Sequence, residues 1–75
     1  MSERIVVNPK IMGGKPVIKG TRIPVYLILE LLSAGYSFKR IIKAYPSLTE
    51  EDVKAAVDYA VQIMKNEEAF DYVVS

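Results

Sequence analysis

The sequence predicts a mostly α-helical fold in which three helices follow a short N-terminal β arm or hairpin. Three observations lead to this prediction. Residues 1–24 combine two short β-branched runs with clustered glycine and proline, which favour strands and turns. The residues after Pro24 carry apolar side chains at helical spacing. Signals for helix ends at Gly35, Ser37, Pro46 and Thr49 divide this part of the chain into three helices.

We expect three segments: a basic β arm over residues 1–24, a trihelical domain over 25–66 and an acidic C-terminal tail over 67–75. A chain of 75 residues without cysteine builds only a modest core and has no disulfide to stabilise it. We therefore expect a homodimer or a higher homo-oligomer. No stretch approaches the roughly 20 apolar residues of a membrane span, so we expect a cytoplasmic protein that has no membrane partner.

The arm contains two candidate strands. Ile5-Val6-Val7 ends at the turn pair Asn8-Pro9, and Val17-Ile18 lies between glycine-containing turns. An isolated two-stranded ribbon is only marginally stable in water. The arm should therefore pack against the helices or against a second protomer.

The first helix is expected from Val25 to Ala34. Pro24 is suited to the first helical position, Thr21 is a candidate cap, and Gly35 is a candidate left-handed stop. Because this helix is apolar on nearly every side, most of its surface must be covered.

The second and third helices begin at recognisable caps. Ser37 precedes a helix from Phe38 to Ala44, and Thr49 begins a helix in which Asp52 replaces the usual Glu or Gln of a capping box. Apolar residues at helical spacing predict the inward face of the third helix; they are Val53, Val57, Ala60, Val61 and Met64.

Residues 37–60 have the layout of a helix-turn-helix, and with the first helix they form a homeodomain-like trihelical unit. The same spacing also fits a plain helical bundle. In a helix-turn-helix the start of the third helix faces DNA, but here it carries Glu50, Glu51 and Asp52, which would repel phosphates.

Positive charge therefore has to come from elsewhere. Arg4 to Leu29 holds five bases and no acid. The candidate DNA-binding residues lie in the arm and on the second helix; they are Lys15, Lys19, Arg22, Lys39, Arg40 and Lys43. Two alternatives stay open: Arg22 as a structural clamp, and the second-helix cations as a solvated helix face.

Enzymatic functions are disfavoured. Histidine and cysteine are both absent, which removes the commonest general base, the commonest metal ligand and the strongest nucleophile. Gly13-Gly14-Lys15 does not have Walker spacing. We therefore expect no catalytic residue, no metal and no cofactor.

The acidic tail carries apolar side chains at Phe70, Tyr72 and Val73. These are candidate partner-binding residues for a basic protein. The alternative is a frayed extension of the third helix.

Three motifs together resemble the family catalogued as domain of unknown function 433: Gly13 to Val25, Ala34 to Ser37, and Tyr45 to Val53. The resemblance covers roughly Ile5 to Ala60 and implies a homeodomain-like fold in a small bacterial or archaeal protein. Members are often regarded as antitoxins encoded beside a PIN-like ribonuclease toxin, which implies binding to their own promoter and neutralisation of the toxin. No catalytic or ligand residues carry over. The rival hypothesis is a protein-interaction module without DNA binding.

Overall fold

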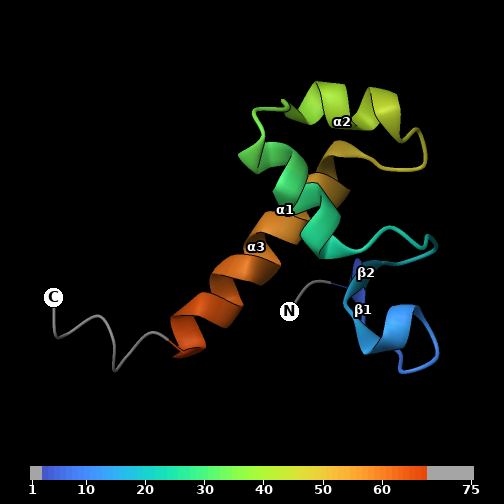
Figure 1. The fold of residues 1–75 in the computed structure, drawn as a ribbon, viewed down its shortest axis with the longest axis vertical. Coiled ribbons are helices and arrows are strands. Elements are labelled where there is room, and N and C mark those ends of the chain that lie inside the picture. Colours follow the sequence, from blue (N-terminus) through green and yellow to red (C-terminus); the bar gives the residue numbers. More distant parts are fainter. Residues whose placement is uncertain (1–2, 68–75) are drawn as a thin grey trace, which may run out of the picture.

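The structure, a computed structural model, describes residues 3–67 (Figure 1). An N-terminal hairpin and three helices confirm the predicted fold class. In chain order the elements are β1 (Ile5–Val6), a 3-10 turn η1 (Met12–Gly14), β2 (Val17–Ile18), α1 (Val25–Ser33), α2 (Phe38–Ala44) and α3 (Glu50–Glu67). The expectations for Phe70, Tyr72 and Val73 lie outside the described residues.

The arm forms a hairpin within its own chain. β1 pairs antiparallel with β2, with Ile5 opposite Ile18 and Val6 opposite Val17. Both β2 side chains are only 1% exposed. A further bridge joins Val17 to Pro24, and β1 contacts α3. The burial expected for this marginal ribbon is therefore supplied by the chain's own helices.

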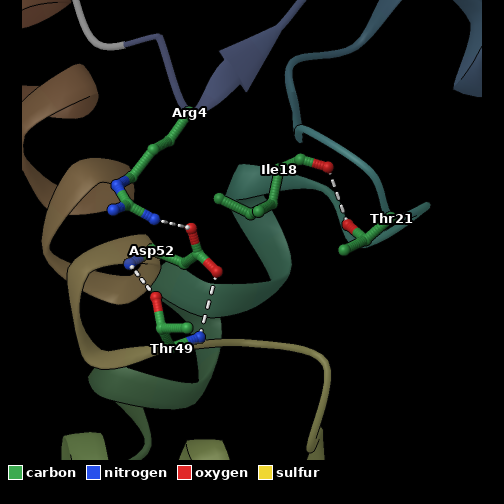
Figure 2. Close-up of polar contacts among 5 residues, drawn as sticks. All are labelled: Arg4, Ile18, Thr21, Thr49 and Asp52. Atoms are coloured by element: carbon green, nitrogen blue, oxygen red, sulfur yellow. Dashed lines mark hydrogen bonds and ion pairs between the residues drawn. The ribbon is translucent and has the colours of Figure 1, made fainter.

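The start of α1 differs from the prediction. Pro24 is the N-cap, with an extended backbone (φ −75°, ψ 151°), instead of the first helical residue. Thr21 does not cap the helix. Its hydroxyl donates to the Ile18 carbonyl at 2.8 Å (Figure 2). The same hydroxyl accepts from the Ile23 N–H at 3.0 Å. Threonine readily closes such local turns, so here it closes the link between β2 and α1.

The end of α1 is as predicted, within one residue. The helix ends at Ser33, and Gly35 follows in the left-handed region at φ 99°. A side chain at this position would strain the backbone, so glycine is favoured where the chain turns toward α2.

The predicted starts of α2 and α3 are confirmed. The Arg40 N–H donates to the Ser37 hydroxyl at 3.1 Å. At α3 the capping box is complete: the Asp52 N–H donates to the Thr49 hydroxyl at 3.1 Å, and the Thr49 N–H donates to the Asp52 carboxylate at 3.0 Å (Figure 2). Aspartate therefore performs the role of the usual glutamate.

The core lies where α1, α2 and the first half of α3 meet the hairpin (Figure 1). These elements form a helix-turn-helix, α2 to α3, with α1 packed against both helices. The buried cluster consists of Ile18, Val25, Ile28, Ile41, Leu48, Val53 and Ala56.

The predicted inward stripe of α3 is only half right. Val53 is 0% exposed, and Val57 and Ala60 are half-buried, but Val61 is 46% and Met64 63% exposed. Figure 1 shows the reason, because the second half of α3 extends away from α1 and α2. The apolar spacing of α3 therefore continues past the point where the core ends, so the last residues of the predicted inward face are not buried by the core.

Candidate functional site

The outer face of α2 carries a cluster of positive charge. Lys39, Arg40 and Lys43 are all exposed, while Ile41 on the opposite face is 0% exposed. The Arg40 guanidinium lies 4.3 Å from the centre of the Tyr36 ring, so a cation–π contact holds it beside the start of the helix. α2 contains no acidic residue. Two helical turns thus present three cations together, which suits a polyanion.

The start of α3 exposes fewer carboxylates to solvent than the sequence predicted. Glu50 and Glu51 are exposed and line a small hollow with Phe38 and Lys54. Asp52 is 8% exposed, because its carboxylate is used in the capping box. The expectation of three outward carboxylates is therefore wrong for Asp52, and two remain.

Asp52 also binds the N-terminal arm. Arg4 donates to its carboxylate at 3.0 Å across 48 positions of sequence (Figure 2). Burial raises the pKa of Asp52, but hydrogen bonds from Thr49 and the bond and charge of Arg4 outweigh it, and the net pKa lies below the ordinary 3.8. Arg4 was counted with the basic arm, and no local signal could reveal its distant partner.

The arm cations lie in different surroundings. The Lys15 ammonium is 5.4 Å from the centre of the Tyr26 ring on α1. Lys19 lines a polar hollow with Glu3, Arg4 and Asp52. Arg22 is exposed in the turn between β2 and α1.

The six candidate DNA-binding residues therefore do not form one patch. Figure 1 shows α2 at one end of the molecule and η1, which Lys15 follows, at the other, with α1 and α3 between them. Lys39, Arg40 and Lys43 are grouped on one helix, whereas the Lys15 ammonium lies over the Tyr26 ring and Lys19 lines a hollow with Glu3, Arg4 and Asp52.

A second feature was not predicted from the sequence. An open groove of about 400 Å³ lies between the arm, α1 and the second half of α3. Its lining is apolar except for Lys15 and the tyrosine hydroxyls, and includes Tyr26, Leu29, Tyr59, Ile63 and Met64. The apolar spacing of α3 was visible in the sequence, but the sequence did not show that no other element of residues 3–67 covers this groove.

Two further properties of residues 3–67 limit the kinds of site that they contain. No group of three or more acidic, histidine or cysteine side chains is arranged to hold a metal ion in this range. No helix within it is long and apolar enough to cross a membrane.

The architecture is that of a small three-helix domain with an N-terminal hairpin, and comparison with known proteins places it in a family. The family model described as "Protein of unknown function (DUF433)" matches residues 5–60. The chain belongs to this family, as the sequence motifs predicted.

A solved structure of a DUF433 member from Anabaena variabilis is similar to this chain with a TM-score of 0.76 and 35% sequence identity. The match covers 95% of this chain and 67% of that one.

Two uncharacterized proteins are also similar. One, y4eO of Sinorhizobium fredii, is 43% identical over 58 residues, which are 77% of this chain and 26% of that protein. The other, from Archaeoglobus fulgidus, is 78% identical over 23 residues, 31% of this chain and 64% of that protein. The chain thus spans about a quarter of the length of the first relative.

Proposed function

We propose that this chain is an antitoxin-type protein that binds the DNA of its own promoter through α2 and neutralises a PIN-like ribonuclease. The observation that carries the DNA-binding part is the acid-free outer face of α2, with Lys39, Arg40 and Lys43 all exposed. Neutralised phosphates and released counterions supply most of the affinity in such contacts.

The proposal gives α2 the role that α3 often has in a helix-turn-helix. The exposed carboxylates of Glu50 and Glu51 at the start of α3 disfavour close approach to phosphates. Lys39 and Lys43 are four residues apart and so share one helix face, beside Arg40. Arg22 in the exposed turn is the arm residue best suited to a further contact, because its planar guanidinium can bind phosphate or a base in a bidentate manner.

A mobility-shift titration against the DNA upstream of the gene, at several salt concentrations, tests this part. We expect K39Q/R40Q/K43Q to bind more weakly and to reduce the salt slope by about 2 to 3. A matched control, K10Q/K54Q/K65Q, removes the same charge from exposed positions elsewhere. This control variant should retain most of the salt dependence of DNA binding.

Two results would contradict DNA binding through α2. One is the absence of any shift by the unaltered protein at low salt. The other is an equal loss from both triple variants, which would mean that only the net charge matters.

Toxin neutralisation is supported by the family resemblance and by the composition of the tail. Phe70, Tyr72 and Val73 lie among acidic residues, which suits a basic nuclease surface. Co-expression with a PIN-like ribonuclease encoded next to the gene tests it: the chain should restore growth and co-purify with the nuclease, and a neighbourhood without such a reading frame would contradict this part of the proposal. F70A/Y72A/V73A should lose both effects, and full rescue by this variant would remove the tail from the proposal.

A protein-interaction module without DNA binding is the second candidate. The apolar groove beside Lys15 and Tyr26 favours it, because such open apolar surfaces commonly bind protein. The two candidates separate in the same experiment, since only the first predicts a salt-dependent shift that needs the α2 cations.

A further inference from the structure

Arg40 is held in place more firmly than the other two cations of α2. Its guanidinium lies 4.3 Å from the centre of the Tyr36 ring, and its backbone N–H donates to the Ser37 hydroxyl at 3.1 Å. The ammonium groups of Lys39 and Lys43 make no hydrogen bond, ion pair or ring contact within residues 3–67. Arg40 is therefore the cation of this face whose side chain has a defined orientation.

The Tyr36 ring is a firm support for this contact. The Tyr36 N–H donates to the Leu31 carbonyl at 3.0 Å. The Gly35 N–H donates to the Leu32 carbonyl at the same distance. These two bonds are the Schellman arrangement that closes the end of a helix, here α1. The ring itself is half-buried and packs against the core cluster, so both its backbone and its side chain are held.

Helix stability alone does not explain a cation at this position of α2. Ser37 is the N-cap, so Arg40 is the third residue of the helix, where a capping box carries Glu or Gln. A positive charge in the first turn of a helix opposes the helix dipole. The contact with the Tyr36 ring offsets part of this cost. A residue that breaks a local rule in this way is more typical of a binding site than of a stabilising contact.

We propose that Tyr36 is a positioning residue, which holds the Arg40 guanidinium so that it binds one DNA phosphate through two hydrogen bonds. This role rests on the proposed DNA binding through α2. The guanidinium is exposed and makes no hydrogen bond or ion pair with another described residue, so its N–H donors are available to phosphate oxygens. Because the side chain is already ordered, less conformational entropy is lost on binding.

Mobility-shift titrations of two variants that conserve the charge test this role. R40K should weaken binding to the promoter DNA by about three- to tenfold, because lysine keeps the charge but loses the paired donors. Y36L should weaken binding by a similar factor, because it removes the ring that holds the guanidinium. Neither variant should change the salt slope, since no charge is lost. Circular dichroism checks that both variants fold.

Two further variants are matched controls. Y36F keeps the ring and removes only the hydroxyl, so it should bind DNA as the unaltered protein does. Y26L removes another ring that lies beside a cation, since the Lys15 ammonium is 5.4 Å from the centre of the Tyr26 ring. Tyr26 lines the apolar groove and not the outer face of α2, so Y26L should retain the affinity.

A double-mutant cycle separates positioning from a general effect on the fold. If the ring acts through Arg40, R40K should weaken DNA binding much less in a Y36L background than in the unaltered protein. If Tyr36 only supports the fold, the effects of the two substitutions on the binding free energy should add.

A second DNA duplex tests that the contact is with phosphate. Contacts to phosphate do not depend on the base sequence. R40K should therefore weaken binding by the same factor on the promoter and on an unrelated duplex of equal length. A loss confined to the promoter would assign Arg40 to a base and overturn the phosphate contact.

Nuclear magnetic resonance measures the contact between Tyr36 and Arg40 without DNA. The ring current of Tyr36 should displace the Arg40 Nε–H signal from that of Arg22, which is exposed in the turn before α1. Y36L should remove this displacement, and Y36F should keep it.

Four results overturn the positioning role while DNA binding through α2 stands. They are an undiminished affinity of R40K, additive effects in the cycle, a loss from Y36F equal to that from Y36L, and an Arg40 signal that Y36L does not move. Absence of any mobility shift by the unaltered protein at low salt instead overturns the proposed function, and the positioning role with it.

Discussion

Both halves of α3 carry apolar residues at helical spacing, but their surroundings differ. In the first half, Val53 and Ala56 are 0% exposed, and Asp52 joins the cap to the arm. In the second half, Val61 and Met64 continue the apolar spacing, but the helix extends away from the core (Figure 1). An apolar stripe therefore predicts which face of a helix is favoured for burial. It does not show whether other elements of the same chain bury that face.

The largest expected difference in the free energy of unfolding is between a valine-to-alanine substitution in the first half of α3 and the same substitution in the second half. Val53→Ala should lower the free energy of unfolding by about 2 kcal/mol, because it leaves a cavity in a filled core. Val61→Ala should change it by less than about 0.5 kcal/mol in the monomer, since Val61 is already 46% exposed and its removal leaves no closed cavity. Urea denaturation at low protein concentration measures both. Equal losses would mean that the second half is covered within a single chain.

An intermediate effect is expected from the acids of the two halves. Asp52→Asn should cost about 1 kcal/mol at neutral pH, because it weakens the cap and removes the charge that binds Arg4. The exposed Asp58→Asn should cost at most about 0.5 kcal/mol.

The pH dependence separates these two variants further. The pKa of Asp52 is lower in the folded chain than the ordinary 3.8, so the native state favours the ionised form. Its contribution is therefore fully present above 3.8 and is lost as the pH falls through the folded pKa. Denaturation curves of the unaltered protein and D52N should converge in acid. If the unaltered protein remains more stable than D52N at a pH well below the folded pKa of Asp52, the charge of Asp52 does not cause the difference in stability.

The smallest effect is expected from the basic partners. Arg4→Gln should cost at most about 1 kcal/mol, because the side chain is half exposed although its bond spans the fold. Lys54→Gln breaks an exposed pair within one helix and should cost about 0.3 kcal/mol. Hydrogen exchange adds a sharper test, since R4Q should speed exchange in the β1–β2 hairpin and K54Q should not. No change in the hairpin would mean that Arg4 does not hold the arm in place.

The candidate site was predictable where its cause is local. Three basic residues beside the inward Ile41 on a seven-residue helix predict an exposed cationic face, and the structure places them so. The surroundings of Lys15, Lys19 and Arg4 were not predictable. Lys15 lies near Tyr26, Lys19 near Glu3 and Arg4 near Asp52 only because the arm folds onto the helices.

The sequence alone determined the three helices and the family, and it predicted two short strands without deciding how they pair; the tertiary structure joins them in a hairpin. Caps, glycine stops and helical spacing depend on residues within a few positions of each other. Only the tertiary structure decided that Thr21 closes a turn, that Asp52 binds the arm, and that α3 extends past its own core. These outcomes depend on which distant atoms compete for the same hydrogen bond or cover the same apolar face, and such competition is settled only when the whole chain packs.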